Sequence, residues 1–290
     1  IIENCKKLKS NQRNEVMKYI DLMTKNKLTS DARYIPFKNG VYNVETDELL
    51  EFSPEIVVTN QIPWNYNSEA YSKLADDTLN NIACNDPEIR SLLEECIGYC
   101  FYRRNQLGKA FFLTGGGANG KSTFINMIRD LLGEDNTSSL DIAELNERFS
   151  VAGLAGKLAN MGDDISDEFL QGRSIATFKK IVTGDRIKAE FKGENPFEFS
   201  PYAKMLFSAN EIPRVRDKTG AVLRRMVIIP FNAVFTKENQ GSNFKPYIAE
   251  NLKSREVMEY LAKIGIEGLK RVNDNRRFTE SSKVKVALKE

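Results

Sequence analysis

The sequence contains no histidine among its 290 residues. This absence excludes Ser-His-Asp and Cys-His catalysis, imidazole general bases and histidine-ligated zinc. Any catalysis must therefore use carboxylates, lysines, arginines and a metal ion. The four cysteines, at positions 5, 84, 96 and 100, fit neither a disulfide framework nor a zinc pattern, which favours a reducing cytosol and a cytoplasmic location.

An excess of charge of one sign and long apolar runs are also missing. Lysine and arginine number 42 against 40 aspartates and glutamates, so the formal net charge is only +2. This balance argues against a protein that coats nucleic acid, although a few lysines on one loop would still focus a local field. No apolar run approaches the roughly eighteen residues of a membrane span, so we expect no membrane partner. The first residue is not Met and four of the last eight are charged, which indicates a piece of a longer protein.

The most informative feature present is a phosphate-binding loop over residues 115–122, which matches G-x-x-x-x-G-K-[ST]. An apolar run precedes it and a helical pattern follows it, as in a strand–loop–helix unit. Glycines let backbone N–H groups surround a triphosphate, and the helix N-terminus adds partial positive charge. We predict that ATP and Mg²⁺ bind here, with Lys121 at the β- and γ-phosphates and the Ser122 hydroxyl on the metal. The predicted nucleotide-binding residues are Gly115, Gly116, Gly117, Ala118, Asn119, Gly120, Lys121, Ser122 and Thr123.

A phosphate loop of this kind needs an acidic partner at the end of a neighbouring strand. Asp163 and Asp164 come one residue after the segment 157–161, which we interpret as a second core strand. We assign Asp163 to the metal and Asp164 to polarising the attacking water. An isolated Asp-Asp pair is also common in a solvated turn, so the assignment depends on its position after a core strand.

Two further polar features lie next to predicted strands. Asn210 follows the apolar segment 203–208, and its amide could hydrogen-bond the attacking water or the γ-phosphate. Alone, such an asparagine is just as often a turn residue. Arg224 and Arg225 precede the segment 226–229, and an arginine supplied by a neighbouring copy can neutralise charge during phosphoryl transfer. Most arginine pairs, however, are ordinary surface ion pairs.

A β-hairpin is predicted where apolar and polar residues alternate on both sides of residues 192–195. Its tip carries Lys192, its arm carries Lys188, and Phe191 lies beside the tip. A lysine at a hairpin tip is usually only solvated. A lysine next to an aromatic ring nevertheless suits single-stranded DNA, since one group contacts phosphate and the other stacks on bases. We therefore predict that these three residues bind DNA.

Strands alternate with helices from residue 109 onward, which predicts an α/β fold with three layers and a largely parallel sheet. Upstream, an Asn-Gly hairpin at 39–40 and further strands precede two helices, which indicates a smaller α+β module. The expected further strands cover 49–52 and 56–62, the expected helices about 70–82 and 87–102, and a later helix about 254–272. We divide the chain into a module over 1–105 that could serve as an oligomerisation collar, an ATPase core over 106–235 and a helical segment over 236–290.

The order of these motifs resembles that of superfamily 3 helicases of the AAA+ class. More narrowly, it is similar to the helicase part of phage, plasmid and pathogenicity-island primase–helicases, to which the poxvirus primase–helicase is related. The resemblance is specific over about 105–235 and looser over 30–105. It implies a hexameric ring that moves 3′ to 5′ on single-stranded DNA and binds ATP between subunits. No primase signature occurs here, so any primase module lies outside this chain.

The resemblance also implies individual roles for the candidate residues. Asn210 matches the sensor asparagine, and Arg225, rather than Arg224, matches the arginine finger. Lys188 and Lys192 fall where the family's pore hairpin contacts DNA. Papillomavirus-type members carry a histidine beside the hairpin lysine, whereas this chain has phenylalanine and glycine there.

Three functions remain compatible with the sequence. The first is an ATP-dependent DNA helicase that acts at replication forks of a mobile element. The second is an initiator or loader in which ATP controls assembly on DNA without processive unwinding. The third, a small-molecule kinase, fits less well because an arginine acting between subunits has little use in a monomeric kinase. The predicted hairpin separates the first two, since a translocating motor needs DNA contacts that move with the nucleotide state.

Overall fold

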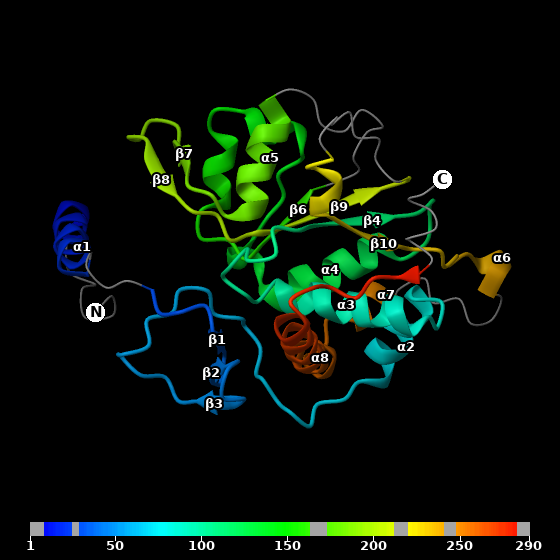
Figure 1. The fold of residues 1–290 in the computed structure, drawn as a ribbon. Coiled ribbons are helices and arrows are strands. Elements are labelled where there is room, and N and C mark those ends of the chain that lie inside the picture. The colour runs from blue at the N-terminus through cyan, green and yellow to red at the C-terminus, as the bar shows by residue number, and fades with distance from the viewer. Residues whose placement is uncertain (1–8, 25–28, 163–172, 212–219, 241–247, 283–290) are drawn as a thin grey trace.

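The structure is a computed structural model that describes residues 9–24, 29–162, 173–211, 220–240 and 248–282 (Figure 1). Its α-helices are α1 (Ser10–Thr24), α2 (Lys73–Ile82), α3 (Pro87–Tyr99), α4 (Lys121–Leu132), α5 (Arg173–Thr183), α6 (Lys237–Gln240), α7 (Ile248–Asn251) and α8 (Arg255–Asn275). Its strands are β1 (Tyr34–Phe37), β2 (Gly40–Asn43), β3 (Glu48–Leu50), β4 (Ala110–Thr114), β5 (Thr137–Ser138), β6 (Ala159–Gly162), β7 (Ile187–Ala189), β8 (Phe197–Phe199), β9 (Lys204–Ala209) and β10 (Met226–Pro230). Short 3-10 helices are η2 (Glu134–Asn136), η3 (Ala143–Asn146), η4 (Ser150–Leu154) and η5 (Leu223–Arg225).

A five-stranded parallel sheet forms the centre of the molecule, in the order β10-β4-β9-β6-β5. In chain order these are its fifth, first, fourth, third and second strands. Because all of them run the same way, the segments after β4, β6 and β9 leave at one edge, which we call the carboxyl edge. The segments before β4, β9 and β10 enter at the opposite edge, the amino edge. The two edges separate the candidate functional groups described below.

Side chains of the sheet alternate between two hydrophobic clusters, as the two-residue period of a strand requires. On β4, Phe111 and Leu113 pack into the cluster that contains α3, α4 and α8. Ala110 and Phe112 pack into the other cluster, with residues of α5 and the 3-10 helices. The sheet is therefore covered on both faces, and the predicted three-layer α/β fold is confirmed. The short edge strand β5 was not predicted, since two residues carry too little apolar pattern.

The amino-terminal module contains a three-stranded antiparallel sheet in the order β1-β2-β3. Phe37 pairs with Gly40 across the predicted hairpin, so this part of the prediction is confirmed. The predicted strand over 56–62 is wrong. That segment contacts two different places, since Val57 exchanges hydrogen bonds with Ser30 and the Ile62 N–H donates to the Pro36 carbonyl. Isolated bonds of this kind hold an extended segment without forming a ladder.

Helices α2 and α3 form as predicted, and α3 begins with a side-chain cap. The Asp86 carboxylate accepts hydrogen bonds from the N–H groups of Glu88 and Ile89, with Pro87 at the first helical position. Helix α8 crosses α3 at very short range (Figure 1). A Cβ built on Gly98 would lie 1.9 Å from the Gly265 carbonyl oxygen, so only glycine permits this approach. Through this crossing the last helix completes the core of the amino-terminal module and the central sheet.

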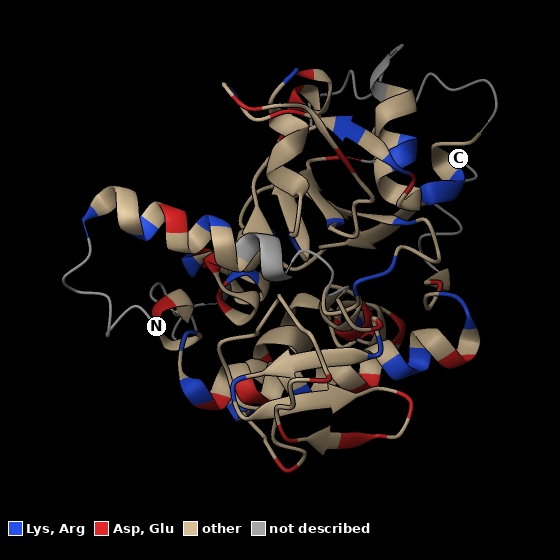
Figure 2. Ribbon diagram, turned by 90° about the vertical axis from the view of Figure 1, so that its left-hand side faces the viewer, with Lys and Arg blue, Asp and Glu red and all other residues tan. Residues whose placement is uncertain are grey.

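Basic and acidic residues are both scattered over the ribbon in Figure 2, in agreement with the small net charge. Cys96 and Cys100 are buried thiols of the α3 region, and Cys84 is exposed. In the described ranges, no helix is long and apolar enough to span a membrane.

Candidate nucleotide and DNA sites

The phosphate loop connects the carboxyl end of β4 to the first residue of α4, as the sequence predicts. Gly120 caps the helix in the left-handed region at a φ of 91°, a conformation that favours glycine. A Cβ on Gly115 would lie 2.3 Å from the Phe231 carbonyl oxygen, which excludes a side chain there. Gly116 and Gly117 face open space instead. The loop is thus fixed at its ends and open in its middle.

Lys121 lies on the first turn of α4 with only 7% of its surface exposed. Its ammonium donates hydrogen bonds to the carbonyl oxygens of Gly115 and, at 3.4 Å, Gly116. Asn119 is also buried, and its side-chain amide donates to the Gly116 carbonyl. The lysine head group therefore lies inside the curve of the loop, where a phosphate of a bound nucleotide would be.

Two backbone hydrogen bonds hold the loop against neighbouring segments of the carboxyl edge. The Gly115 N–H donates to the Ala209 carbonyl at 3.1 Å, so the loop starts beside the end of β9. The Phe235 N–H donates to the Ala118 carbonyl at 2.7 Å. Asn210, the predicted sensor residue, is the exposed residue directly after Ala209 and therefore lies next to the loop. The structure therefore places the phosphate loop and the predicted sensor residue Asn210 next to each other.

Asp163 and Asp164 lie outside the described residues. The strand that precedes them, β6, pairs with β9 so that its last residue, Gly162, lies opposite Phe207. The chain therefore leaves β6 at the carboxyl edge, the same edge as the phosphate loop. Their roles at the metal and the attacking water stay predictions.

The residues present at the loop fit a nucleotide and its magnesium ion. The open glycines leave room for a triphosphate, and the buried Lys121 supplies a cation at that position. Ser122 is exposed and Thr123 is half-buried on the first turn of α4, where a hydroxyl can face a metal on the phosphates. Oxygen ligands, which a small hard cation such as Mg²⁺ prefers, are thus available at this end of α4.

The arginine pair lies at the opposite edge of the sheet. Arg224 and Arg225 form the end of η5 directly before β10, and Met226 pairs with Ala110 at the start of β4. The five residues of β4 therefore separate the pair from the phosphate loop by about 16 Å at 3.3 Å per residue. The Arg225 guanidinium donates to the Ala221 carbonyl at 2.8 Å, and its Nε is buried with no partner among the described residues.

The predicted hairpin is confirmed as the antiparallel pair β7–β8, with Lys188 opposite Glu198. Its turn closes with the Glu194 N–H donating to the Phe191 carbonyl at 3.0 Å. Lys188 and Lys192 are both exposed. Phe191 is 42% exposed and stacks on Phe197, with ring centroids 5.4 Å apart. The three predicted DNA-binding residues thus share one exposed hairpin that projects from the amino edge (Figure 1).

A basic pocket of about 750 Å³ at the amino edge was not predicted. Five cationic residues line it: Arg103, Arg104, Lys109, Arg224 and Arg225. Lys109 donates to the Arg224 carbonyl at 2.5 Å, and burial, reinforced by the nearby Arg225, lowers its pKa. The basic run before β4 is visible in the sequence. Its spacing does not indicate that it contacts Arg224 and Arg225, which lie more than a hundred positions later.

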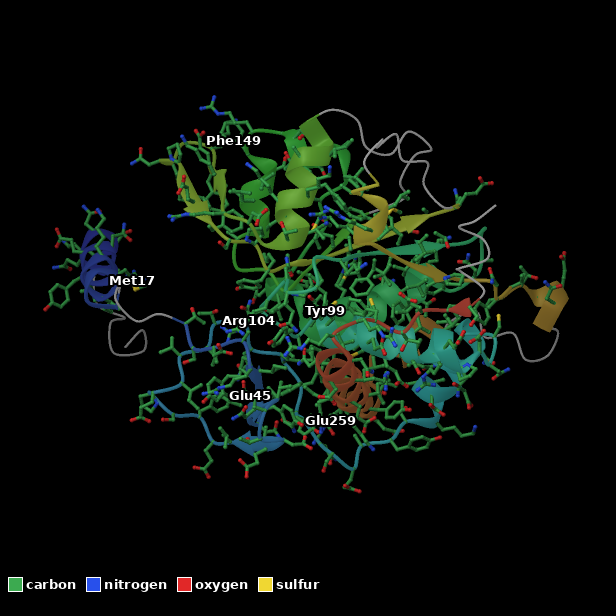
Figure 3. All side chains as sticks on the ribbon, viewed as in Figure 1. Met17, Glu45, Tyr99, Arg104, Phe149 and Glu259 are labelled. Atoms are coloured by element: carbon green, nitrogen blue, oxygen red, sulfur yellow. The ribbon has the colours of Figure 1, made fainter. Side chains whose placement is uncertain are left out.

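Two of these arginines hold the amino-terminal module. Arg103 donates to the carbonyl oxygens of Ser30, Asp31 and Tyr34 at 2.9–3.2 Å, and burial lowers its pKa. Arg104 forms an ion pair with the Asp31 carboxylate, and Figure 3 shows it between the amino-terminal sheet and the central part of the molecule. The remaining cations of this pocket, which do not hold the amino-terminal module, are Lys109, Arg224 and Arg225.

Comparisons with protein families match two parts of the chain. Residues 4–98 match the family described as "D5 N terminal like". Residues 113–225 match a "Family of unknown function (DUF5906)". The first match covers the amino-terminal module and the second covers most of the central sheet with the phosphate loop.

Curated relatives come from large viruses and a virophage. The chain is 30% identical over 233 residues to "Putative helicase V13" of Sputnik virophage, covering 76% of this chain and 29% of that protein. It is 28% identical over 220 residues to "Putative helicase L207/L206" of Acanthamoeba polyphaga mimivirus, covering 72% of this chain and 22% of that protein. The chain thus spans less than a third of the length of these relatives.

The fold is shared with the solved NrS-1 C-terminal region. The A-form apo structure of that region has a TM-score of 0.59 at 15% identity, covering 91% of this chain and 63% of that one. The D5-type match, the viral relatives and this fold together support a superfamily 3 helicase of the primase–helicase type. The resemblance seen in the motif order is thereby confirmed.

Proposed function

We propose that this chain is the ATPase motor of a DNA helicase that assembles as a ring, a hexamer by family resemblance, and moves along single-stranded DNA. Its task would be to unwind duplex DNA at replication forks of a viral or related mobile genome. The viral relatives named as helicases support the helicase-type function. The wider activity of the longer protein, with a primase module elsewhere, belongs to the same proposal.

The observation that carries the proposal is the separation of the phosphate loop from the arginine pair. Lys121 lies at the carboxyl edge of the sheet and Arg225 at the amino edge. A rigid strand lies between them, so an arginine side chain cannot reach the loop of its own chain. An arginine that serves hydrolysis must then act on the loop of another copy, which requires an assembly with repeated, head-to-tail interfaces.

The chain's own residues would divide the work at such an interface. Lys121 and the loop N–H groups bind the phosphates of ATP, and bound Mg²⁺ would neutralise charge on the β- and γ-phosphates. Asn210 orients the attacking water beside the loop, with Asp163 and Asp164 as the predicted acidic partners. Arg225 of the neighbouring copy stabilises the charge that develops on the transferred phosphoryl group.

The DNA contact would be made by the β7–β8 hairpin. Lys188 and Lys192 supply exposed cations for phosphates, and the exposed face of Phe191 suits a base. Since every base has an aromatic face, such contacts serve a motor that must accept any sequence. The hairpin projects from the same edge as the arginine pair, so an event at the interface can reach the DNA over a short path.

A subunit-mixing experiment tests the shared site. Lys121→Ala and Arg225→Ala should each abolish ATP hydrolysis alone, while Arg225→Ala should still bind a fluorescent ATP analogue. In a one-to-one mixture, about a quarter of the interfaces join an intact loop to an intact arginine, so hydrolysis should partly return. Arg224→Ala, which alters the adjacent arginine, is the matched control and should retain most of the activity.

Two results would contradict the proposal. Hydrolysis by Arg225→Ala at the wild-type rate would show that no arginine crosses between copies at this position. A mixture that stays inactive, although native mass measurement shows mixed assemblies, would mean that each copy encloses its own nucleotide.

A further inference from the structure

Residues 103–109, which lead from the amino-terminal module into β4, contact both ends of the β7–β8 hairpin through one side chain. Asn105 lies in this segment, and its amide Nδ2 donates to the Ile181 carbonyl at 3.0 Å and to the Pro201 carbonyl at 3.3 Å. Ile181 is in the last turn of α5, before the hairpin, and Pro201 follows the hairpin before β9. A single amide therefore holds the two ends between which the hairpin projects.

The Thr-Gly-Asp run before the hairpin forms the turn that permits this contact. Gly184 follows α5 with a φ of 75°, and a Cβ there would lie 3.2 Å from the Pro201 carbonyl oxygen. The Thr183 hydroxyl donates to the Asp185 carboxylate at 2.8 Å, which closes the turn. The turn brings the first end of the hairpin beside the second, within reach of Asn105.

The same segment contacts the arginine pair. Lys109, four residues after Asn105, donates to the Arg224 carbonyl, and all three residues line the basic pocket together with Arg225. Among the described residues, Asn105 Oδ1 and Arg225 Nε are buried and have no hydrogen-bond partner. Buried polar atoms without a partner are costly, so these two atoms call for an explanation.

We infer that Asn105 is a positioning residue that couples the arginine pair to the β7–β8 hairpin. When a nucleotide in the neighbouring copy engages Arg225, the segment 103–109 moves with it, and Asn105 transmits that movement to both ends of the hairpin. Because both ends are held by one amide, the hairpin moves as a unit and its turn stays closed. This inference rests on the proposed function of the hairpin and the arginine pair.

If the Asn105 bond were purely structural, its loss would lower hydrolysis equally with and without DNA. The proposed coupling predicts a different result. Asn105 makes no contact with the phosphate loop, which lies at the other edge of the sheet. Its loss should therefore leave nucleotide binding and hydrolysis without DNA unchanged. The loss should appear only where hydrolysis depends on DNA, because that dependence requires the connection between hairpin and arginines.

The experiment compares Asn105→Ala and the isosteric Asn105→Asp in the 290-residue chain. Asn105→Asp keeps the shape and removes both donors, so it serves if the alanine variant fails to fold. We measure ATP hydrolysis with and without an oligothymidine strand, and strand separation on a forked duplex. Both variants should keep the hydrolysis rate without DNA, while stimulation by the oligonucleotide and strand separation fall about tenfold.

Gln106→Ala is the matched control. Gln106 lines the same pocket, but its amide donates to Asn273 of α8 and not to the hairpin. This variant should keep wild-type stimulation. Full stimulation in both Asn105 variants would overturn the inference, and so would an equal loss of hydrolysis with and without DNA. If the wild-type chain itself shows no stimulation by DNA, the proposed function fails, and this outcome is distinct from the first two.

Discussion

Lys204 on β9 offers a test of the buried core that depends on pH. It is 1% exposed, and its ammonium donates to the Tyr102 carbonyl at 2.5 Å and the Tyr202 carbonyl at 2.6 Å, with the ring of Tyr99 at 4.8 Å. Burial lowers the pKa of this lysine to about 7 from 10.5 in the unfolded chain. Substitution by methionine keeps the length of the side chain and removes the titrating group.

The sign of the effect follows from proton linkage. Between pH 7 and pH 10.5 the unfolded chain holds a proton on Lys204 that the folded chain has mostly lost. The free energy of unfolding therefore rises with pH in this window. Below the window this residue adds no pH dependence, because both states hold the proton, and the cost of burying the charged ammonium is fully present. From pH 7 to pH 9.5 the rise is on the order of 3 kcal/mol for the wild type, since each unit of pKa difference corresponds to 1.36 kcal/mol. Lys204→Met lacks this rise.

The assay is urea unfolding at several values between pH 7 and pH 9.5, followed by fluorescence. The quantity of interest is the difference between wild type and Lys204→Met, because contributions of the neighbouring tyrosines are present in both chains. Lys188→Met, an exposed lysine, is the matched control and should differ from wild type by the same amount at every pH. If the wild-type and Lys204→Met curves run parallel over the whole window, the buried lysine keeps its proton and the reasoning is refuted.

Three further substitutions test other parts of the structure. Lys192→Ala should keep ATP hydrolysis but lose strand separation, and normal unwinding by this variant would remove the hairpin from the DNA site and favour a loader. Gly98→Ala places a Cβ 1.9 Å from a backbone oxygen of α8 and should destabilise the chain by about 1–3 kcal/mol or more in urea unfolding, whereas Gly153→Ala, with open space around it, should not. Asp86→Ala removes a helix cap and should cost about 1 kcal/mol in the same assay. Ser72→Ala, at a cap without a side-chain bond, should cost little, and an equal loss in both would refute the capping argument.

The parts of the fold that depend on local pattern could be predicted from the sequence. The strand, glycine loop and helix around Lys121 follow from residue spacing, and so does the β7–β8 hairpin. The cap of α3 also needs only neighbouring residues. These features use contacts within a few positions of the chain, so periodicity and turn residues specify them.

Where long-range contacts decide the conformation, the sequence pattern did not predict the strands correctly. The segment 56–62 has the composition of a strand but is held by single bonds to two separate places, so no ladder forms. The two residues of β5 carry no pattern of their own and become a strand only because β6 lies beside them. Propensity was overridden in both places by the packing of distant residues.

The sequence by itself determined the chemistry of this protein: the absence of histidine, the phosphate loop with Lys121, and the order of motifs shared with superfamily 3 helicases. Only the tertiary structure decided where these groups lie relative to one another. The parallel sheet places the phosphate loop at one edge and Arg225 at the other, and it brings Asn105 to the two ends of the hairpin. The physical reason is that strand order and register are set by burial of the whole sheet between two layers, which no local run of residues records.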